Sequence, residues 1–126
     1  MKNIKNLKMY KKVLIIVDMV NGFVREGALA DQHIEGTINN QVALIKQYQE
    51  KGNLVIFIKD THTLDSVEHD RFGGAVHCIK GTKEAELVDE LKQFEGRENT
   101  LTLEKNSTSY IWAENKKDGY SFVDIL

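Results

Sequence analysis

Three short apolar runs, each ending at a charged residue, constrain most strongly how this chain can fold. The runs cover residues 13–17, 54–58 and 100–103, and the first two contain no polar residue. Continuous β-branched and apolar runs of this length are typical of strands buried on both faces of a sheet. The first strand is expected over about 12–18 and is followed directly by a loop with Asn21 and Gly22. The third run predicts a strand least strongly of the three, because threonine alternates with leucine in it.

Helical patterns separate these runs. Residues 31–51 carry apolar side chains three or four positions apart, and Gly52 follows as a natural stop. Residues 83–95 repeat the pattern between a capping Thr82 and Gly96. A last short helix is expected near Tyr120. The stripes predicted to face the core are Ile34, Ile38, Val42, Ile45 and Tyr48, then Ala85, Val88, Leu91 and Phe94, and finally Phe122, Val123 and Leu126.

Strands that alternate with helices predict an α/β fold with a parallel sheet and right-handed crossovers. The carboxyl ends of parallel strands share one edge, where open sheets bind their ligands. Asp18, Asp60 and Lys105 end the three runs, so we expect these charges to converge. We find no repeat or linker and predict one domain over residues 1–126, with residues 1–11 as a polar leader.

Composition narrows the function classes. The 126 residues carry a net charge of −2, which gives no basic field for nucleic acid or an anionic membrane. No apolar run approaches the roughly 20 residues that span a bilayer. The single cysteine, Cys78, excludes an internal disulfide and fits a reducing cytoplasm. On its own it is most simply a small, partly buried residue.

The long segment 59–81 carries groups that could bind a metal. Asp60 and His62 follow the second strand, and His77 lies fifteen residues beyond His62. One carboxylate with two imidazoles suits zinc, manganese or iron. Solvated loops also carry Asp and His, so spacing alone leaves that alternative open. We expect His33 to lie on the surface, and His69 to be solvated unless the loop folds so that it becomes a ligand.

Asp18 and Lys105 also have two interpretations. They can form a simple ion pair, which stabilises little when partly exposed. They can also serve a nucleophile, with the carboxylate as proton acceptor and the ammonium favouring a thiolate.

Four motifs together resemble those of the isochorismatase-like cysteine hydrolases. Within that superfamily, the motifs most resemble those of the nicotinamidase/pyrazinamidase branch. The resemblance runs in order through about residues 12–112. The motifs are Val-Asp18-Met-Val-Asn21-Gly22-Phe23, Asp60-Thr-His62, His77-Cys78-Ile-Lys-Gly81-Thr82-Lys-Glu-Ala-Glu and Glu104-Lys105-Asn-Ser-Thr-Ser.

The resemblance implies a three-layer α/β/α fold that hydrolyses a small amide such as nicotinamide to an acid and ammonia. It implies a divalent metal, with zinc expected first and manganese or iron as alternatives. The implied roles are Asp18 as general base, Lys105 as the triad lysine, Phe23 as pocket wall, Asp60, His62 and His77 as metal ligands, and Asp70 or Glu68 as a fourth ligand.

The sequence also departs from the family pattern. The family's catalytic cysteine follows a fourth strand that is not found here, and Cys78 instead matches a cysteine beside the metal-binding histidine. We therefore expect a truncated domain of about three strands. Residues 72–76 lack the usual proline or aromatic pair, and Val20 stands where many members have glutamine.

These departures lead to further expectations. A strand over 13–17 without its second neighbour is an apolar edge, so we predict a homo-oligomer or another pairing there. We predict no ammonia release from nicotinamide by this chain alone. The alternatives are an inactive remnant that acts as a metal-binding, ligand-binding or interaction subunit, or another hydrolase of the superfamily. The metal motif argues against the last of these.

Overall fold

The computed structural model describes residues 9–125 and contains one five-stranded sheet in the order β1-β2-β3-β4-β5. The strands are β1 (Val13–Val17), β2 (Leu54–Asp60), β3 (Thr100–Lys105), β4 (Glu114–Asn115) and β5 (Tyr120–Ser121). The first three run parallel, which confirms the three predicted strands. The antiparallel hairpin of β4 and β5 was not predicted, and most of the predicted leader lies outside the described residues.

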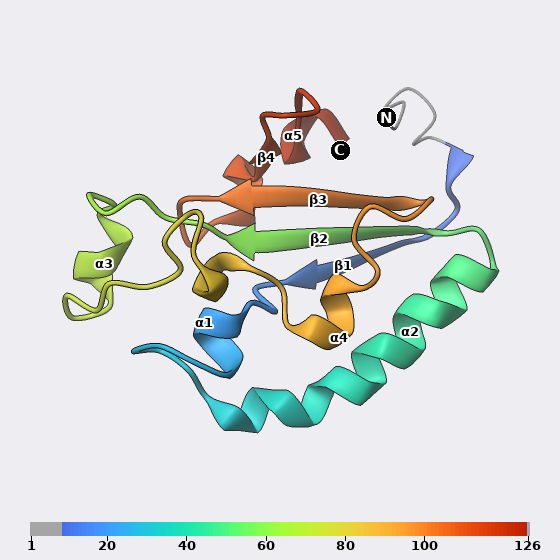
Figure 1. Ribbon diagram of the computed structural model, residues 1–126. Helices are drawn as coiled ribbons and strands as arrows, with labels where there is room; N and C mark the ends of the chain where they lie inside the picture. The colour runs from blue at the N-terminus through green and yellow to red at the C-terminus, as the bar shows by residue number, and fades with distance from the viewer. Residues whose placement is uncertain (1–8, 126) are drawn as a thin grey trace.

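The register of the parallel strands brings their carboxyl ends to one edge (Figure 1). Val17 pairs with Ile58, and Asp60 pairs with Lys105. The ladder continues one residue further on each side: the Asp18 amide donates to the Ile58 carbonyl at 2.9 Å, and the Thr61 amide to the Lys105 carbonyl at 2.8 Å. The predicted convergence of the three charged strand ends follows from this register.

The helix predicted over 31–51 forms in two parts. A 3₁₀ segment η2 (Gln32–Thr37) leads into α2 (Ile38–Glu50). The Thr37 hydroxyl donates to the Ile34 carbonyl at 2.7 Å, a local bond that competes with α-helical pairing. Gly36 also disfavours the α-helix. The predicted stripe is confirmed: Ile38 and Ile45 are buried, and the other members pack against the same core cluster.

The prediction of a single helix over residues 83–95 is wrong. The chain forms η3 (Lys83–Ala85), an extended stretch over 86–88, and the one-turn helix α4 (Asp89–Lys92). The extended stretch bonds to the loop after β1, because the Glu86 carbonyl accepts from the Asn21 amide at 2.9 Å and the Val88 amide donates to Met19 at 3.0 Å. The Thr82 hydroxyl donates to the Ile79 carbonyl and forms no cap. The predicted core residues are nevertheless buried.

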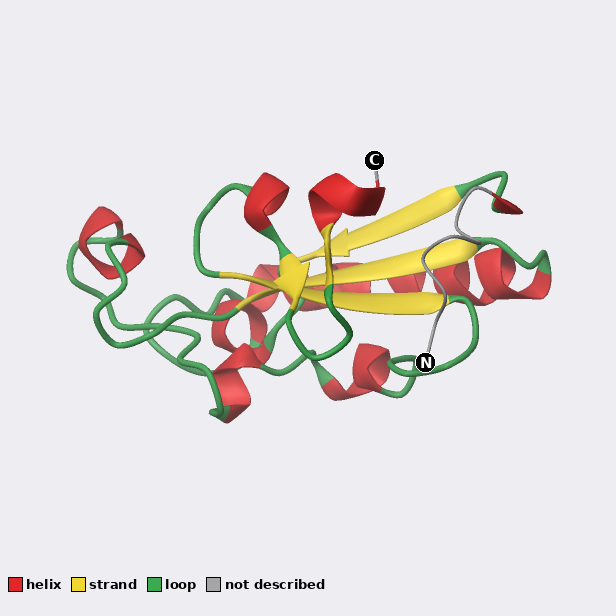
Figure 2. Ribbon diagram, turned by 90° about the horizontal axis from the view of Figure 1, so that it is seen from above, coloured by secondary structure: helices red, strands yellow, loops and turns green. Residues whose placement is uncertain are grey.

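Helices lie on both sides of the sheet (Figure 2), and each face carries its own cluster of buried side chains. On one face, α1 (Asn21–Val24), α2 and α4 pack over side chains such as Ile16, Val55 and Phe57. On the other, η4 (Tyr110–Trp112) and α5 (Phe122–Ile125) contribute to a cluster over β2 and β3. Phe122 is buried as predicted, Val123 is exposed, and Leu126 lies outside the described residues. The α/β class is confirmed.

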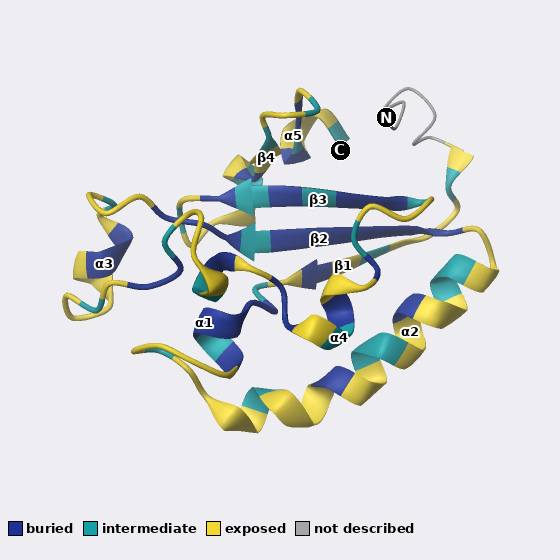
Figure 3. Cartoon of the chain, in the orientation of Figure 1, coloured by how far each residue is buried: buried dark blue, intermediate teal, exposed yellow. Residues whose placement is uncertain are grey.

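The second cluster stops short of β1. Val13, Ile15 and Val17 align with Leu54, Ile56 and Ile58 of β2, yet they are 42–43% exposed whereas their β2 partners are buried (Figure 3). Within residues 9–125, β1 is the end strand of the sheet. The described chain also holds no helix long and apolar enough to cross a membrane.

Candidate functional site

Lys105 lies at the centre of the polar groups on the carboxyl edge. Its ammonium donates to Asp60 Oδ1 at 3.1 Å, to Asp18 Oδ2 at 3.2 Å and to the Ser107 carbonyl at 3.2 Å. The Lys105 and Asp60 side chains are almost fully buried, while that of Asp18 is 34% exposed. One buried cation therefore pairs with two carboxylates from the ends of two neighbouring strands.

Asp18 is held in an unusual conformation. Its φ of 60° is in the left-handed region, which costs energy for a residue with a Cβ and turns the chain sharply after β1. Burial raises the pKa of Asp18, and the Lys105 ammonium opposes that rise. Its Oδ1 accepts no hydrogen bond from residues 9–125, although the ammonium lies 3.0 Å away. A partly buried carboxylate with a raised pKa is suited to accept a proton.

Asp60, His62 and His77 form a compact cluster. Each offers one ligand atom, and these atoms lie within 4.8 Å of one another. Asp60 Oδ2 is 2.6 Å from His62 Nε2 and 3.6 Å from His77 Nε2. All three side chains are buried. The structure thus brings together the three residues that the sequence predicted as metal ligands.

The hydrogen bonds around the two imidazoles fit a cation at this point. His62 Nδ1 donates to Asn106 Oδ1 at 2.7 Å, and His77 Nδ1 donates to the Ala75 carbonyl at 2.7 Å. In the neutral form of each ring this leaves the lone pair on Nε2, the atom that faces the Asp60 carboxylate. His77 Nε2 is buried and has no hydrogen-bond partner among the described residues. Two nitrogen donors and one carboxylate are a donor set that a divalent metal accepts.

His69 is buried, so the expectation that it is solvated is wrong. It belongs to α3 (Glu68–Arg71), and Gly73 and Gly74 take positive φ values as the chain turns back after this helix. Its Nε2 donates to the Thr63 carbonyl at 2.9 Å, and its Nδ1 accepts from the His77 amide at 3.4 Å. His69 thus packs against His77 and lies outside the cluster of three.

The two carboxylates considered as a fourth ligand differ from each other. Glu68 is buried and accepts a hydrogen bond from the Thr108 hydroxyl at 2.7 Å, which lowers its pKa. Asp70 is exposed. Neither belongs to the cluster of three. Glu68 instead ties the long loop after β2 to the loop after β3.

Aromatic rings flank His77. The Phe23 ring centroid is 5.9 Å from that of His77, and the Phe72 centroid is 5.1 Å away. Phe23 is half-buried and Phe72 is 44% exposed. These rings make one side of the site apolar. His33, as expected, is on the surface, where it bonds Asp31.

Cys78 is fully buried behind the site and has a φ of 48°. Burial and the nearby negative charges of Asp60, Glu84 and Asp18 raise the pKa of its thiol. A thiol that resists ionisation is a poor nucleophile. The sequence predicted a small, partly buried residue, and the structure buries it fully.

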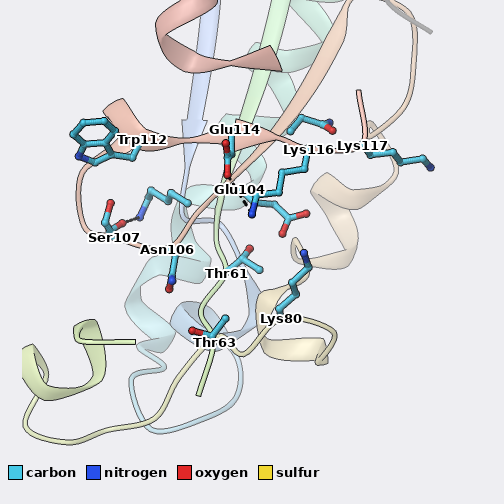
Figure 4. Close-up of a pocket in the computed structure, with 12 residues that line it drawn as sticks. Thr61, Thr63, Lys80, Glu104, Asn106, Ser107, Trp112, Glu114, Lys116 and Lys117 are labelled. Carbon is cyan, nitrogen blue, oxygen red and sulfur yellow. Dashed lines mark hydrogen bonds and ion pairs between the residues drawn. The ribbon is translucent and has the colours of Figure 1, made fainter. Parts of the chain in front are cut away.

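A cavity of about 380 Å³ opens beside the cluster, on the β4 side of the sheet edge (Figure 4). Its walls include Thr61, Thr63, Lys80, Asn106 and Trp112. Lys105 also lines this cavity, whereas Asp18, Phe23 and the two cluster histidines do not, so the cavity meets the site only at Lys105.

Sequence reasoning missed the supporting residues of the loop after β3. Asn106 and Thr108 contact His62 and Glu68. Both lie in the Glu104–Ser109 motif, but neither residue type nor spacing indicates which side chain turns toward the cluster. Only the register of β3 against β2 supplies that information.

Fold and site together define an α/β protein whose polar groups gather where its parallel strands end. The chain belongs to the isochorismatase domain family, which matches residues 12–118. The resemblance to the isochorismatase-like superfamily is therefore confirmed.

The relatives support this assignment. Nicotinamidase 1 of Arabidopsis thaliana is 30% identical over 118 residues, which cover 88% of this chain and 47% of that protein. N-carbamoylsarcosine amidase from Thermoplasma acidophilum superposes with a TM-score of 0.70 at 27% identity, over 84% of this chain and 58% of that one. Pyrazinamidase of Pyrococcus horikoshii in complex with zinc superposes with a TM-score of 0.62 at 28% sequence identity. The match covers 74% of this chain and 50% of that one. The chain spans about half the length of these proteins.

Proposed function

We propose that this chain carries the proton acceptor, the lysine and the metal ligands of a nicotinamidase-like amidohydrolase. The contact of Lys105 with both Asp18 and Asp60 is the observation that carries the proposal. This contact links Asp18, a carboxylate suited to proton transfer, to Asp60, a carboxylate of the cluster with His62 and His77. The nicotinamidase and pyrazinamidase relatives support an amide such as nicotinamide as substrate.

Asp18 and Lys105 divide the acid–base work in this proposal. Asp18 accepts a proton from a thiol nucleophile, and the raised pKa of its carboxyl group helps it to hold that proton. The Lys105 ammonium stabilises the resulting thiolate by its charge. Because Lys105 also contacts Asp60, its position depends on both strands.

Asp60, His62 and His77 would hold the metal ion, with zinc expected first and manganese or iron as alternatives. A divalent ion bound there supplies a Lewis acid that can hold a ring nitrogen of the substrate. Phe23 offers an apolar face next to His77 for a flat ring. Glu68 is engaged with Thr108 and Asp70 is exposed, so the proposal rests on three protein ligands.

The only thiol of this chain does not fit the nucleophile. Cys78 is the single cysteine, is fully buried and has a raised pKa. We therefore expect the 126-residue chain by itself to release no ammonia from nicotinamide. This same observation favours a second candidate function, a non-catalytic module that binds a metal and a small ligand.

Metal content and ligand binding test the proposal. The purified chain should hold about one zinc per chain, and His62→Ala should lose it, because one of three ligands is gone. His33→Ala is the matched control, since His33 is an exposed histidine outside the cluster. Nicotinamide added to the zinc-loaded chain should shift NMR signals of Phe23 and His77. N-carbamoylsarcosine, the substrate type named for one relative, serves as the competing ligand.

The outcomes separate the two candidates. Nicotinamide binding without ammonia release supports a site that lacks only its nucleophile. Zinc binding with no response to either amide supports a non-catalytic module whose small ligand is neither of these amides. A chain that holds no zinc, or that holds it equally well in His62→Ala, contradicts the proposed metal site. Turnover of nicotinamide by the purified chain would show that the nucleophile has been assigned wrongly.

A further inference from the structure

Asn106 makes the shortest contact between the candidate metal cluster and the loop after β3. Its Oδ1 accepts the hydrogen bond of His62 Nδ1 at 2.7 Å. Asn106 directly follows Lys105, so a single strand end supplies both the central ammonium and this amide oxygen. The residue itself is exposed and lies on the wall of the cavity beside the cluster (Figure 4).

The backbone brings these two side chains together. The Thr61 amide bonds to the Lys105 carbonyl at 2.8 Å, which extends the β2–β3 ladder up to the residue before His62. On its other side, His62 forms an isolated parallel bridge with Ile79, through its own amide and the Lys80 amide, both at 2.8 Å. The backbone of His62 is thus held from two directions, and the remaining freedom is the rotation and tautomer of its ring.

We infer that Asn106 is a positioning residue for the metal site: its amide oxygen holds the proton of His62 on Nδ1 and thereby keeps Nε2 free to bind the ion. An imidazole with its proton on Nδ1 has its only lone pair on Nε2. That atom is 2.6 Å from Asp60 Oδ2, within the cluster. Partners on the second nitrogen of a ligating histidine fix its orientation and strengthen metal binding. This inference rests on the proposed metal site and extends it by one residue.

Ser66 is the other polar side chain near the same nitrogen, and its geometry is weaker. Its Oγ is 3.4 Å from His62 Nδ1, and it also accepts from the Glu68 amide at 3.3 Å. A hydroxyl can donate or accept, so it does not select one tautomer, whereas an amide oxygen only accepts. Ser66→Ala is therefore the matched control for a change at Asn106.

Zinc affinity of three variants tests the inference. Asn106→Leu keeps the approximate size but removes the acceptor, and zinc should bind about 10- to 100-fold more weakly in competition with a chelator. Asn106→Asp restores an acceptor and should bind zinc as well as the unmodified chain or better. Ser66→Ala should change affinity less than about twofold. Because Asn106 is exposed, these changes leave the buried clusters intact.

A second readout follows the proton itself. In the zinc-loaded chain, the His62 Nδ1 proton should give a slowly exchanging downfield NMR signal, which Asn106→Asp retains and Asn106→Leu loses. Equal zinc affinity and an equal signal in Asn106→Leu would overturn the role of Asn106 while leaving the metal site in place. If the unmodified chain binds no zinc, the proposed metal site and this inference fail together.

Discussion

Lys105 supplies the positive charge that stabilises the two carboxylates of the site. Its ammonium contacts Asp18 and Asp60, and its side chain is 2% exposed. Replacement by methionine leaves two carboxylates near each other without their cation. Loss of one partner from a buried ion pair typically costs about 3–5 kcal/mol. We expect Lys105→Met to lower the free energy of unfolding by this amount, measured by urea denaturation at pH 7.

Lys59 provides the matched control for that experiment. It lies near the end of the neighbouring strand and pairs with Glu95 at 3.4 Å, but both side chains are partly exposed. Such a pair contributes at most about 1 kcal/mol. Equal losses in Lys59→Met and Lys105→Met would contradict the view that Lys105 stabilises a buried pair of carboxylates.

Gly22 is required by close packing behind the site. A Cβ at this position would lie 2.7 Å from Cys78 Sγ and 3.1 Å from the Glu84 side chain. Overpacking of this kind costs about 1–3 kcal/mol, so Gly22→Ala should lower the thermal midpoint. The same change in a Cys78→Ala background should cost clearly less, because the closest atom is gone. An equal cost in both backgrounds would show that the sulfur is not the obstacle.

Two members of the cluster of Asp60, His62 and His77 were predictable at the residue scale because they lie at the end of a strand or directly after it. Asp60 is the last residue of β2 and His62 lies two positions further on. The third member, His77, lies in the long loop and was predicted from the His77-Cys78 motif. His69 and Asn106 were not predictable in the same way. The turn at α3 directs His69 inward, and the β2–β3 register directs Asn106 to His62. Both depend on contacts between distant segments.

At the scale of elements, α2 attaches to the sheet through a narrow apolar stripe. Ile45 is fully buried in the cluster beneath the sheet, while its neighbour Leu44 is 42% exposed. Truncation of a buried isoleucine removes its transfer free energy and leaves a cavity, at a cost of about 2–5 kcal/mol. We expect Ile45→Ala to cost this much in chemical denaturation and Leu44→Ala to cost well under 1 kcal/mol. Similar costs would mean that α2 packs with another face.

The segment 83–95 shows why a correct stripe can accompany a wrong helix. Its apolar residues are buried as predicted, but Glu86 and Val88 form backbone bonds with the loop after β1. In a short segment, helical spacing of apolar residues predicts which side chains are buried. It does not predict the backbone conformation, which here follows from hydrogen bonds with the loop after β1. The pairing also holds Met19 and Asn21, next to Asp18, in place.

At the scale of the whole molecule, the sheet is covered unevenly. Both faces of β2 are buried, whereas on β1 only Leu14 and Ile16 pack into the core cluster. Strand order was predictable for the three parallel strands, since each crossover returns to a neighbouring position. The hairpin of β4 and β5 was not, because two-residue strands carry no periodic pattern.

We propose that the free edge of β1 pairs two copies of this chain. Within the described residues β1 is the end strand, and its row of Val13, Ile15 and Val17 is more than 40% exposed. An apolar edge strand with unpaired backbone groups is a template for another strand, and two identical copies can pair about a two-fold axis. Sedimentation should therefore show a dimer or larger assembly. Ile15→Lys should shift it toward the monomer, because lysines would face each other across the new edge.

Val123→Lys is the control for that change, since Val123 is similarly exposed but lies on α5 and not on β1. It should leave the assembly unchanged, and both variants should keep their stability within about 0.5 kcal/mol because each replaces an exposed side chain. A monomeric unmodified chain would refute pairing through β1. An assembly that persists in Ile15→Lys but dissociates in Val123→Lys would move the interface to the face that α5 covers.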